Sequence, residues 1–434
     1  MTKSIFNSWT AGIGVAVIAG VTLGLAPHAA RAAFSSGSTG ADGAFNPTCS
    51  PTPCTVETAL PDSGIFNFTT VNIAAGVTAT FSRNTSNTPV TILATGDVNV
   101  LGAIDVSGLT AGPSTLPGRS GPGGFDGGVG ASVVAPNGGT GLGPGGGGGG
   151  IAAGNTANNK PGGGGFGSAG GTANGGTPSP AGASYGVPTL IPIIGGSGGG
   201  GGAINGCGAS GGGGGGGGAI LIASSGTITV TGTVAANGGS GGLCANNCAS
   251  AQSGAGGAGG GIRLVANSIT GVGTISANGG APGPDAAGCS GPNGAGGGFG
   301  RIRLEAVNLT FAGTVGPVTS GFPGPVNVAS FPMVGIVSVN GVNAPVVPRG
   351  SFDAPADVTL SPVATNPVTV SLKASNVPLG TLIAVTVTPQ TGAATTVNST
   401  PLTGSTANST ATASVTLPNG ISVVSAAATF ATPN

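Results

Sequence analysis

Apolar and polar residues alternate in four segments of the chain, and these segments align without gaps on one shared glycine. In chain order they read VTILATGDVNVLGAIDVSG, ILIASSGTITVTGTVAANG, GIRLVANSITGVGTISANG and RIRLEAVNLTFAGTVGPVT, with the shared glycines at Gly102, Gly232, Gly273 and Gly313. The last three segments recur after about 40 residues, a spacing typical of stacked structural repeats.

Alternation with a period of two predicts β-strands that bury one face, as at Ile220 and Ile222. A single unit cannot bury this face alone, whereas stacked units share a continuous aliphatic core. We therefore predict an all-β protein in which residues 55–324 form a parallel β-helix-like stack, with residues 66–81 as its first coil and cap. The alternation is also compatible with a β-sandwich.

Glycine-rich inserts separate the predicted strands over about residues 112–218, 238–260 and 279–300. One glycine run alone stays disordered, because ordering each backbone costs about 1–2 kcal/mol and a hydrogen bond returns only about 0.5–1.5 kcal/mol. Several runs side by side pack closely, since no side chain holds extended threefold helices apart. We therefore predict a polyglycine-type layered bundle that continues from the coils, with flexible surface loops as the alternative.

The composition changes in residues 331–434, where Val, Thr, Ala and Ser replace most of the glycine. Asn340-Gly341 and Asn419-Gly420 each separate apolar runs, which is a strong signal for a two-residue hairpin. About seven strands in about 100 residues favour an immunoglobulin-like β-sandwich. Modules of this kind act as spacers, present a binding surface or bind a partner.

Residues 1–32 have the features of a secretory signal peptide. Lys3 precedes a short apolar run at residues 11–25, and Ala30-Arg31-Ala32 supplies small residues for cleavage after Ala32. We expect a secreted or cell-surface protein with no membrane span after cleavage, and an uncleaved N-terminal anchor is the alternative. Residues 33–54 form a polar entry segment.

Removal of the signal peptide limits the possible chemistry. The chain has a single histidine, His28, which lies inside that segment, so the mature chain lacks the usual base of Ser-His-Asp and Cys-His catalysis. The ten basic and ten acidic residues are scattered, so we expect no nucleic-acid partner. No GxxxxGK[ST] phosphate loop occurs, and we expect no cofactor.

Six cysteines in an exported chain favour disulfide bonds. The spacing suggests two short loops and one long bridge, and this pairing is one of several possible ones: Cys49–Cys54, Cys244–Cys248 and Cys207–Cys289. The long bridge would clamp two glycine-rich segments together. A zinc site is the alternative, but no histidine is left to complete one, so we expect no metal.

Carboxylates are the candidates for carbohydrate chemistry, because glycosidases use two carboxyl groups a few ångström apart. Asp97 and Asp105 flank Gly102 in one predicted coil and are the weak carbohydrate-site candidates. Asp97 stands in a TGDV turn, where Asp ordinarily bends the backbone. Glu305 can pair with Arg303 across a solvated strand face. We expect no catalytic residue, with a polysaccharide-binding or polysaccharide-cleaving protein as the alternative.

A second alternative is ice binding. Thr227, Thr229, Thr231 and Thr233 alternate in TITVTGT, which predicts four threonines on one strand face. Threonine is also a common residue on the solvated face of a strand. We expect the ladder to be interrupted in the neighbouring coils, where Ser276 and Asn308 intervene.

The pattern GGGGAILIAS followed by ITVTGTVAANGG resembles Gly-rich exported bacterial proteins with adhesin-like parallel β-helices. The glycine-rich inserts also resemble the polyglycine sandwich of phage tail-fibre adhesins, from which the chain departs by its signal peptide. The resemblance covers about residues 55–324 and is compositional. It implies a secreted structural or adhesive protein without catalytic activity, with surface glycans or other matrix proteins as partners, and it carries over no individual binding residue.

Overall fold

The computed structural model describes residues 33–434, apart from residues 113, 154–155, 174–176, 207, 245–250, 285–293, 327–331, 347, 353–354, 362–363 and 431–434. The chain divides into two units, Met1–Ala33 and Phe34–Asn434, and the fold described below is that of the second. Its described residues form strands and no α-helix, which confirms the predicted all-β class. None of their elements is a helix long and apolar enough to cross a membrane.

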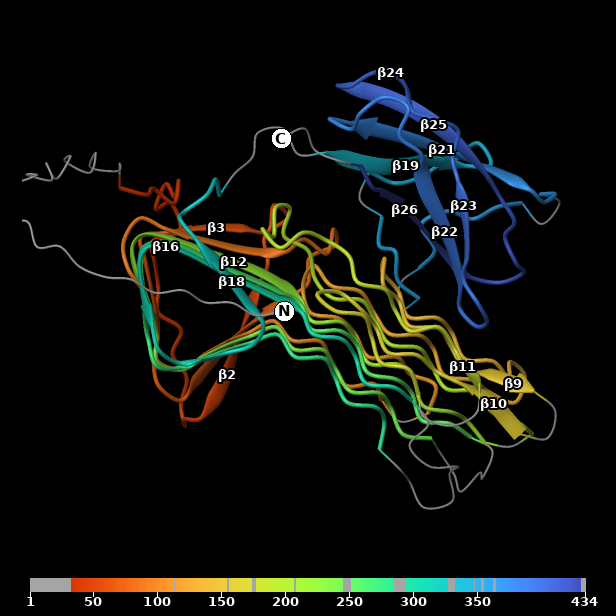
Figure 1. The fold of residues 1–434 in the computed structure, drawn as a ribbon, viewed down its shortest axis with the longest axis horizontal. Helices are drawn as coiled ribbons and strands as arrows, with labels where there is room; N and C mark the ends of the chain where they lie inside the picture. Colours follow the sequence, from red (N-terminus) through yellow and green to blue (C-terminus); the bar gives the residue numbers. More distant parts are fainter. Residues whose placement is uncertain are drawn as a thin grey trace, which may run out of the picture. The chain divides into compact units, whose positions relative to one another are not determined.

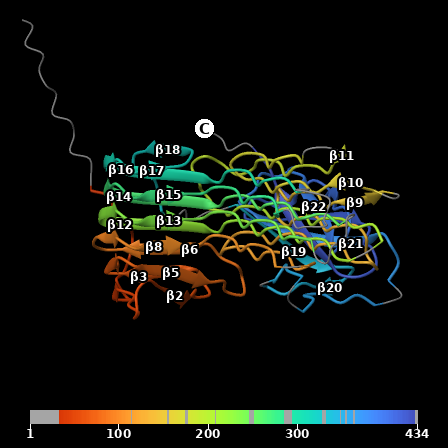
Figure 2. The ribbon, with the colours of Figure 1, turned by 90° about the horizontal axis from the view of Figure 1, so that it is seen from below.

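Two parallel sheets contain the four aligned segments, and each segment contributes to both. The first sheet runs in the order β1 (Ala44–Phe45), β4 (Thr70–Ile73), β7 (Val98–Val100), β12 (Ala219–Val230), β14 (Gly261–Gly271), β16 (Arg301–Phe311) and β18 (Val318–Gly321), with β6 (Val90–Ala94) also beside β12 and β3 (Ile65–Phe68) beside β6. The second runs in the order β17 (Thr314–Val315), β15 (Thr274–Ser276), β13 (Thr233–Ala235), β8 (Ala103–Asp105), β5 (Val77–Ser82) and β2 (Cys54–Ala59). Figure 2 shows the strands of this second sheet stacked one upon another.

The inward side chains of successive strands stack in rows. Ile222 lies in register with Ile92 on one side and Leu264 on the other, and Leu264 is in turn opposite Leu304. All four are buried in one aliphatic core that both sheets share. The period-two alternation therefore located the buried face correctly.

The shared glycines stand at the corner between the two sheets. A Cβ atom on Gly232 would collide with the carbonyl oxygen of Gly102, and one on Gly273 with the carbonyl oxygen of Gly232. A Cβ atom on Gly313 would likewise collide with the carbonyl oxygen of Gly273. Each coil thus rests on the backbone of the previous one at this corner, which leaves no room for a side chain.

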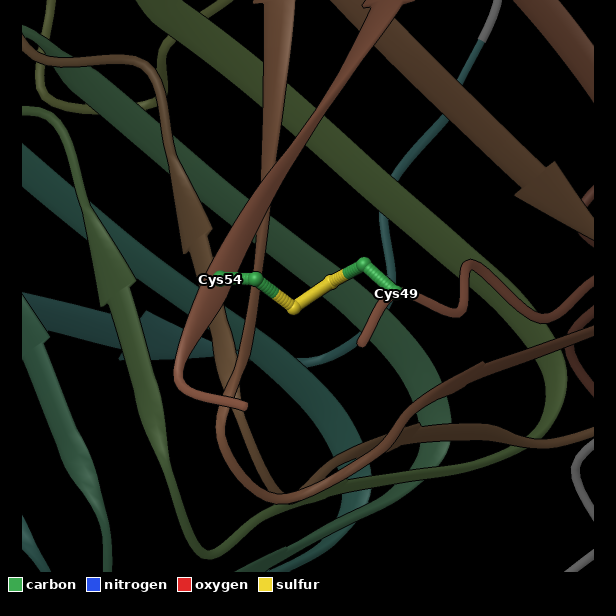
Figure 3. The surroundings of a disulfide bond; sticks show 2 residues. All are labelled: Cys49 and Cys54. Atoms are coloured by element: carbon green, nitrogen blue, oxygen red, sulfur yellow. A yellow bond between two sulfur atoms is a disulfide. The ribbon is translucent and has the colours of Figure 1, made fainter. Parts of the chain in front are cut away.

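Aromatic rings fill the first coils of the stack. Phe45 stacks on Phe68, with ring centroids 5.0 Å apart, and Phe66 stacks on Phe68 at 5.3 Å. Beside them, the Cys49–Cys54 disulfide closes the loop before β2, as predicted (Figure 3). Its Cα atoms are 6.2 Å apart.

The described parts of the glycine-rich inserts contain extended segments that run side by side (Figure 1). Residues 211–218 form the best example, because all eight amides donate hydrogen bonds with a period of three. The amides of Gly211, Gly214 and Gly217 donate to the carbonyl oxygens of Gln252, Ala255 and Ala258, respectively. Those of Gly212, Gly215 and Gly218 donate to a second segment, at Ser114, Leu109 and Val106. Those of Gly213 and Gly216 donate to a third, at Gly128 and Phe125.

The carbonyl oxygens of the same run accept hydrogen bonds from three further segments. Gly214 accepts from Gly199, Gly215 from Gly239 and Gly216 from Gly121. Residues 211–218 therefore have six neighbouring segments, which fits a threefold extended helix in a close-packed layer. This run is thus hydrogen-bonded along its whole length.

The junction between coil and glycine segment is fixed by a short ladder of polar side chains. The Oγ atom of Ser107 accepts a hydrogen bond from the Asn237 amide at 2.9 Å. The Oδ1 atom of Asn237 accepts one from the Asn278 amide at 2.8 Å. Ser107 and Asn237 thus each tie the start of one glycine segment to the start of the next.

A small sheet of β9 (Ile151–Ala153), β10 (Thr156–Lys160) and β11 (Thr177–Pro178) interrupts the glycine-rich region. The C-terminal region contains two antiparallel sheets around a separate apolar core. One has the order β20 (Val342–Asn343), β19 (Met333–Val339), β21 (Val368–Ser375), β25 (Asn408–Val415) and β24 (Thr403–Ser405); the other has the order β23 (Thr395–Asn398), β22 (Ile383–Pro389) and β26 (Ser422–Ala428).

The two predicted hairpins in this region have different outcomes. Asn340 and Gly341 both have positive φ and join β19 to β20, where Val339 pairs with Val342, so this hairpin is confirmed. The Asn419-Gly420 hairpin is wrong, because β25 and β26 lie in different sheets. The turn there carries the chain from one sheet to the other.

Candidate functional site

The two weak carbohydrate-site candidates each hold the backbone at a bend. The Oδ1 atom of Asp97 accepts a hydrogen bond from the Thr227 amide at 2.8 Å, where the register between β12 and β14 shifts. The Oδ1 atom of Asp105 accepts one from the Ser107 amide at 2.8 Å, where β8 turns into the first glycine segment. Asp97 precedes β7 of the first sheet, whereas Asp105 ends β8 of the second, so the two carboxylates serve separate turns.

Asp126 is a buried carboxylate inside the glycine-rich region. Its Oδ1 atom accepts a hydrogen bond from Nη1 of Arg83 at 2.6 Å and another from the Ser120 amide at 2.8 Å. The ion pair therefore fastens two glycine-rich segments to the residue that follows β5.

Glu305 is a second buried, heavily bonded carboxylate, and it lies on the outward face of β16. It accepts hydrogen bonds from Arg263 at 2.9 Å, from Arg303 at 3.0 Å and from the Gly324 amide at 2.8 Å. Burial alone would raise the pKa of Glu305, but the hydrogen bonds from Arg263, Gly324 and Arg303 outweigh it and hold that pKa below its usual value.

The predicted Glu305–Arg303 pair is therefore present, but its setting differs from the expected solvated face. Arg263 and Glu305 are both buried, and Arg263 also donates to the carbonyl oxygen of Pro325. The chain returns over this face after β18, and Val326 packs against Leu221 and its neighbours. The charges thus secure the returning segment to the stack.

Tyr185 and Arg301 mark the junction between the glycine segments and the last coil. The Tyr185 hydroxyl donates to the Gly195 carbonyl oxygen at 2.6 Å and accepts from Ser197 at 3.0 Å. Burial raises the pKa of Tyr185 above its usual value. The Arg301 guanidinium donates to the Tyr185 carbonyl oxygen at 2.9 Å and lies 5.6 Å from the centre of the Phe166 ring.

A shallow pocket of about 260 Å³ lies beside Arg301. Its wall includes Phe299, whose side chain is half exposed, together with Pro188 and Thr319. The pocket combines one guanidinium with an apolar wall, but the guanidinium is already bonded to backbone and stacked on an aromatic ring. It is therefore a structural junction with a small open surface.

The predicted threonine ladder is wrong in its geometry. Thr227 and Thr229 belong to β12 of the first sheet, whereas Thr233 belongs to β13 of the second, so the residues do not share one strand face. The expected interruption holds for one row and fails for another. Thr227 is in register with Ser268 and then Asn308, so that row is interrupted, whereas other threonines recur down the stack. Thr229 is in register with Thr270 and Thr310.

The second sheet carries the longer row. Its outward positions in register are Thr55, Thr78, Ala103, Thr233, Thr274 and Thr314. Five of these six strands therefore present threonine at the same position. The sequence does contain a signal for this row. Thr233, Thr274 and Thr314 each follow the shared glycine of their segment, so a comparison of that position between segments would have found them.

The remaining cysteine predictions fall largely outside the described residues. Cys244 is disulfide-bonded and buried, but Cys207, Cys248 and Cys289 are not among the residues described, so these pairings stay predictions. Within the part of the chain that the structure describes, no group of three or more His, Cys, Asp or Glu residues is placed to hold a metal ion.

Comparison with known proteins adds no relative: no protein-family model, no curated protein and no solved structure matches this chain.

Proposed function

We propose that this chain is an exported, non-catalytic structural or adhesive protein of the cell surface or extracellular matrix. In this proposal residues 55–324 form a parallel β-helix-like stack extended by a polyglycine bundle, and residues 331–434 form an immunoglobulin-like module. The observation that carries it is the bonding of residues 211–218 to six neighbouring segments. Such packing makes a rigid body from bare backbone, which suits a scaffold or platform.

The roles of the carboxylates support a non-catalytic protein. Asp97 and Asp105 each accept a backbone amide at a bend, and Asp126 and Glu305 are paired with arginines. A glycosidase needs two carboxyl groups that face one sugar from a shared cleft. The carboxylates above instead stabilise turns and inter-segment contacts.

Two antiparallel sheets around one core support the immunoglobulin-like assignment of the C-terminal region. Their strands alternate between buried and exposed residues, as β21 and β25 illustrate. A module of this kind spaces or presents a binding surface, and surface glycans or other matrix proteins are the partners we propose.

The experiment that separates this function from a polysaccharide-cleaving one is a turnover screen. Mature protein would be incubated with acidic and neutral polysaccharides, beside the variants Asp97→Asn and Asp105→Asn. We expect no cleavage, together with recovery of the protein in the secreted or surface fraction and binding on a glycan or matrix-protein array. Cleavage that either variant abolishes would overturn the proposal.

A further inference from the structure

One row of positions on the outward face of the second sheet repeats hydroxyl and methyl groups. The threonine row at Thr55, Thr78, Thr233, Thr274 and Thr314 is interrupted only by Ala103. Two positions further along the strands, a second row contains Glu57, Thr80, Asp105, Ala235 and Ser276. All members of the first row are at least partly exposed.

The fold fixes the spacing and the side-chain direction along this row. Parallel pairing sets neighbouring strands about 4.7–4.9 Å apart. Threonine is stiff at χ1, so side chains in register hold their hydroxyl and methyl groups in similar positions. The inward neighbours of Thr233 and Thr274 are Val234 and Ile275, which are buried in the stacked core and anchor the strands.

The array fits a lattice of water. Hydrogen-bonded oxygens in water lie about 2.75 Å apart, and tetrahedral bonding then places second-neighbour oxygens about 4.5 Å apart. This spacing differs from the strand spacing by only about 0.2–0.4 Å, so several successive threonines can match one row of the lattice. A threonine hydroxyl both donates and accepts, as each lattice water does.

We propose that the outward face of this sheet binds ice. The threonine row is uncharged, and a periodic row selects a ligand that is itself periodic. The aromatic clusters of the described residues lie elsewhere, in the core of the first coils and around Tyr185, so this face lacks the stacking platform that favours sugar rings. Ice binding is independent of whether the protein also acts as a scaffold or adhesin.

The test uses the mature protein and slowly grown ice. We expect the unaltered protein to be enriched in the ice fraction and to slow ice recrystallisation. Thr274→Tyr, which places a bulky ring in the middle of the row, reduces the enrichment at least tenfold, and Thr274→Val, which removes only the hydroxyl, reduces it less. The matched control is Thr270→Tyr on the first sheet, which leaves enrichment unchanged.

Far-UV circular dichroism and melting curves would establish that each variant is folded. Exclusion of the unaltered protein from ice overturns the proposal. So does retention of ice binding by folded Thr274→Tyr. Binding to insoluble cellulose or chitin that Thr274→Tyr abolishes, without ice enrichment, assigns the face to polysaccharide instead.

Discussion

The amide of Gly213 donates a hydrogen bond to the carbonyl oxygen of Gly128 at 2.8 Å, although the two residues belong to different glycine-rich segments. The carbonyl oxygen of Gly213 in turn accepts one from Gly118 at 2.8 Å. A hydrogen bond worth about 0.5–1.5 kcal/mol and weak Cα–H···O contacts of about 0.5–1 kcal/mol each offset an ordering cost of about 1–2 kcal/mol per residue. The bundle is therefore stable only when many segments are packed together.

Close packing makes the central glycines intolerant of any side chain. A Cβ atom on Gly214 would lie closer than 3.0 Å to the carbonyl oxygen of Gly239, which is backbone and has little freedom to move. We expect Gly214→Ala to lower the free energy of unfolding by about 1–3 kcal/mol or more, as overpacking does. Urea denaturation followed by circular dichroism measures this loss.

Gly296 supplies the matched control for that experiment. It also lies in a glycine-rich segment, but the nearest atom to a Cβ there is the Gly280 carbonyl oxygen at 3.6 Å, an ordinary contact. Gly296→Ala should leave the free energy of unfolding within about 0.5 kcal/mol of that of the unaltered protein. Equal effects of the two substitutions would contradict close packing around Gly214.

The buried pair of Arg263 and Glu305 should be sensitive to loss of one charge. Glu305→Gln keeps the size of the side chain but leaves the buried Arg263 without its full countercharge. We expect a loss of about 3–5 kcal/mol in the free energy of unfolding. Glu57→Gln, at an exposed position on β2, is the control and should change little; a similarly small change for Glu305→Gln would show that the pair is dispensable.

The same carboxylate predicts a pH dependence. Because the folded protein holds the pKa of Glu305 below its ordinary value of about 4.3, the contribution of this group is complete above that pH. It declines as the pH falls below about 4.3 and is lost once the pH passes the folded-state pKa. Urea midpoints measured between neutral pH and about pH 3 should therefore fall more steeply for the unaltered protein than for Glu305→Gln, and parallel curves would rule out this contribution.

The Cys49–Cys54 disulfide closes a loop between residues separated by 5 positions in the sequence. The chain-entropy estimate for so short a loop is about 2 kcal/mol. We expect the double variant Cys49→Ser/Cys54→Ser to lose about this much stability in urea unfolding. Ser50→Ala, in the same exposed loop, tests whether a substitution there matters by itself, and a double variant as stable as Ser50→Ala would refute the expectation.

The sequence predicted the features that depend on local alternation. The buried rows through Ile222 and Leu264 follow from a period of two, because each strand must turn its apolar residues the same way. Features that depend on which strands meet were harder to predict. Asn419-Gly420 has the composition of a hairpin turn, yet long-range pairing places β25 and β26 in different sheets.

The residues of the candidate site likewise divide into those that local sequence predicts and those that depend on long-range contacts. The bond from Arg303 to Glu305 was predictable, because the two residues are close neighbours on one strand. The burial of that pair was not, because it depends on residues 324–326 returning over the face. Tyr185 carried no signal for its role, since its partner Ser197 and the Arg301 guanidinium come from separate glycine-rich and strand segments.

Hydrogen exchange of the amides of residues 211–218 tests the central claim most directly, because order in bare backbone requires those amides to be bonded. The account predicts slow exchange in this run, comparable to that of the buried strand β12 that follows it. Exchange at the rate of an unstructured peptide, with β12 still protected, would show that the glycine segments are loops and would contradict the account.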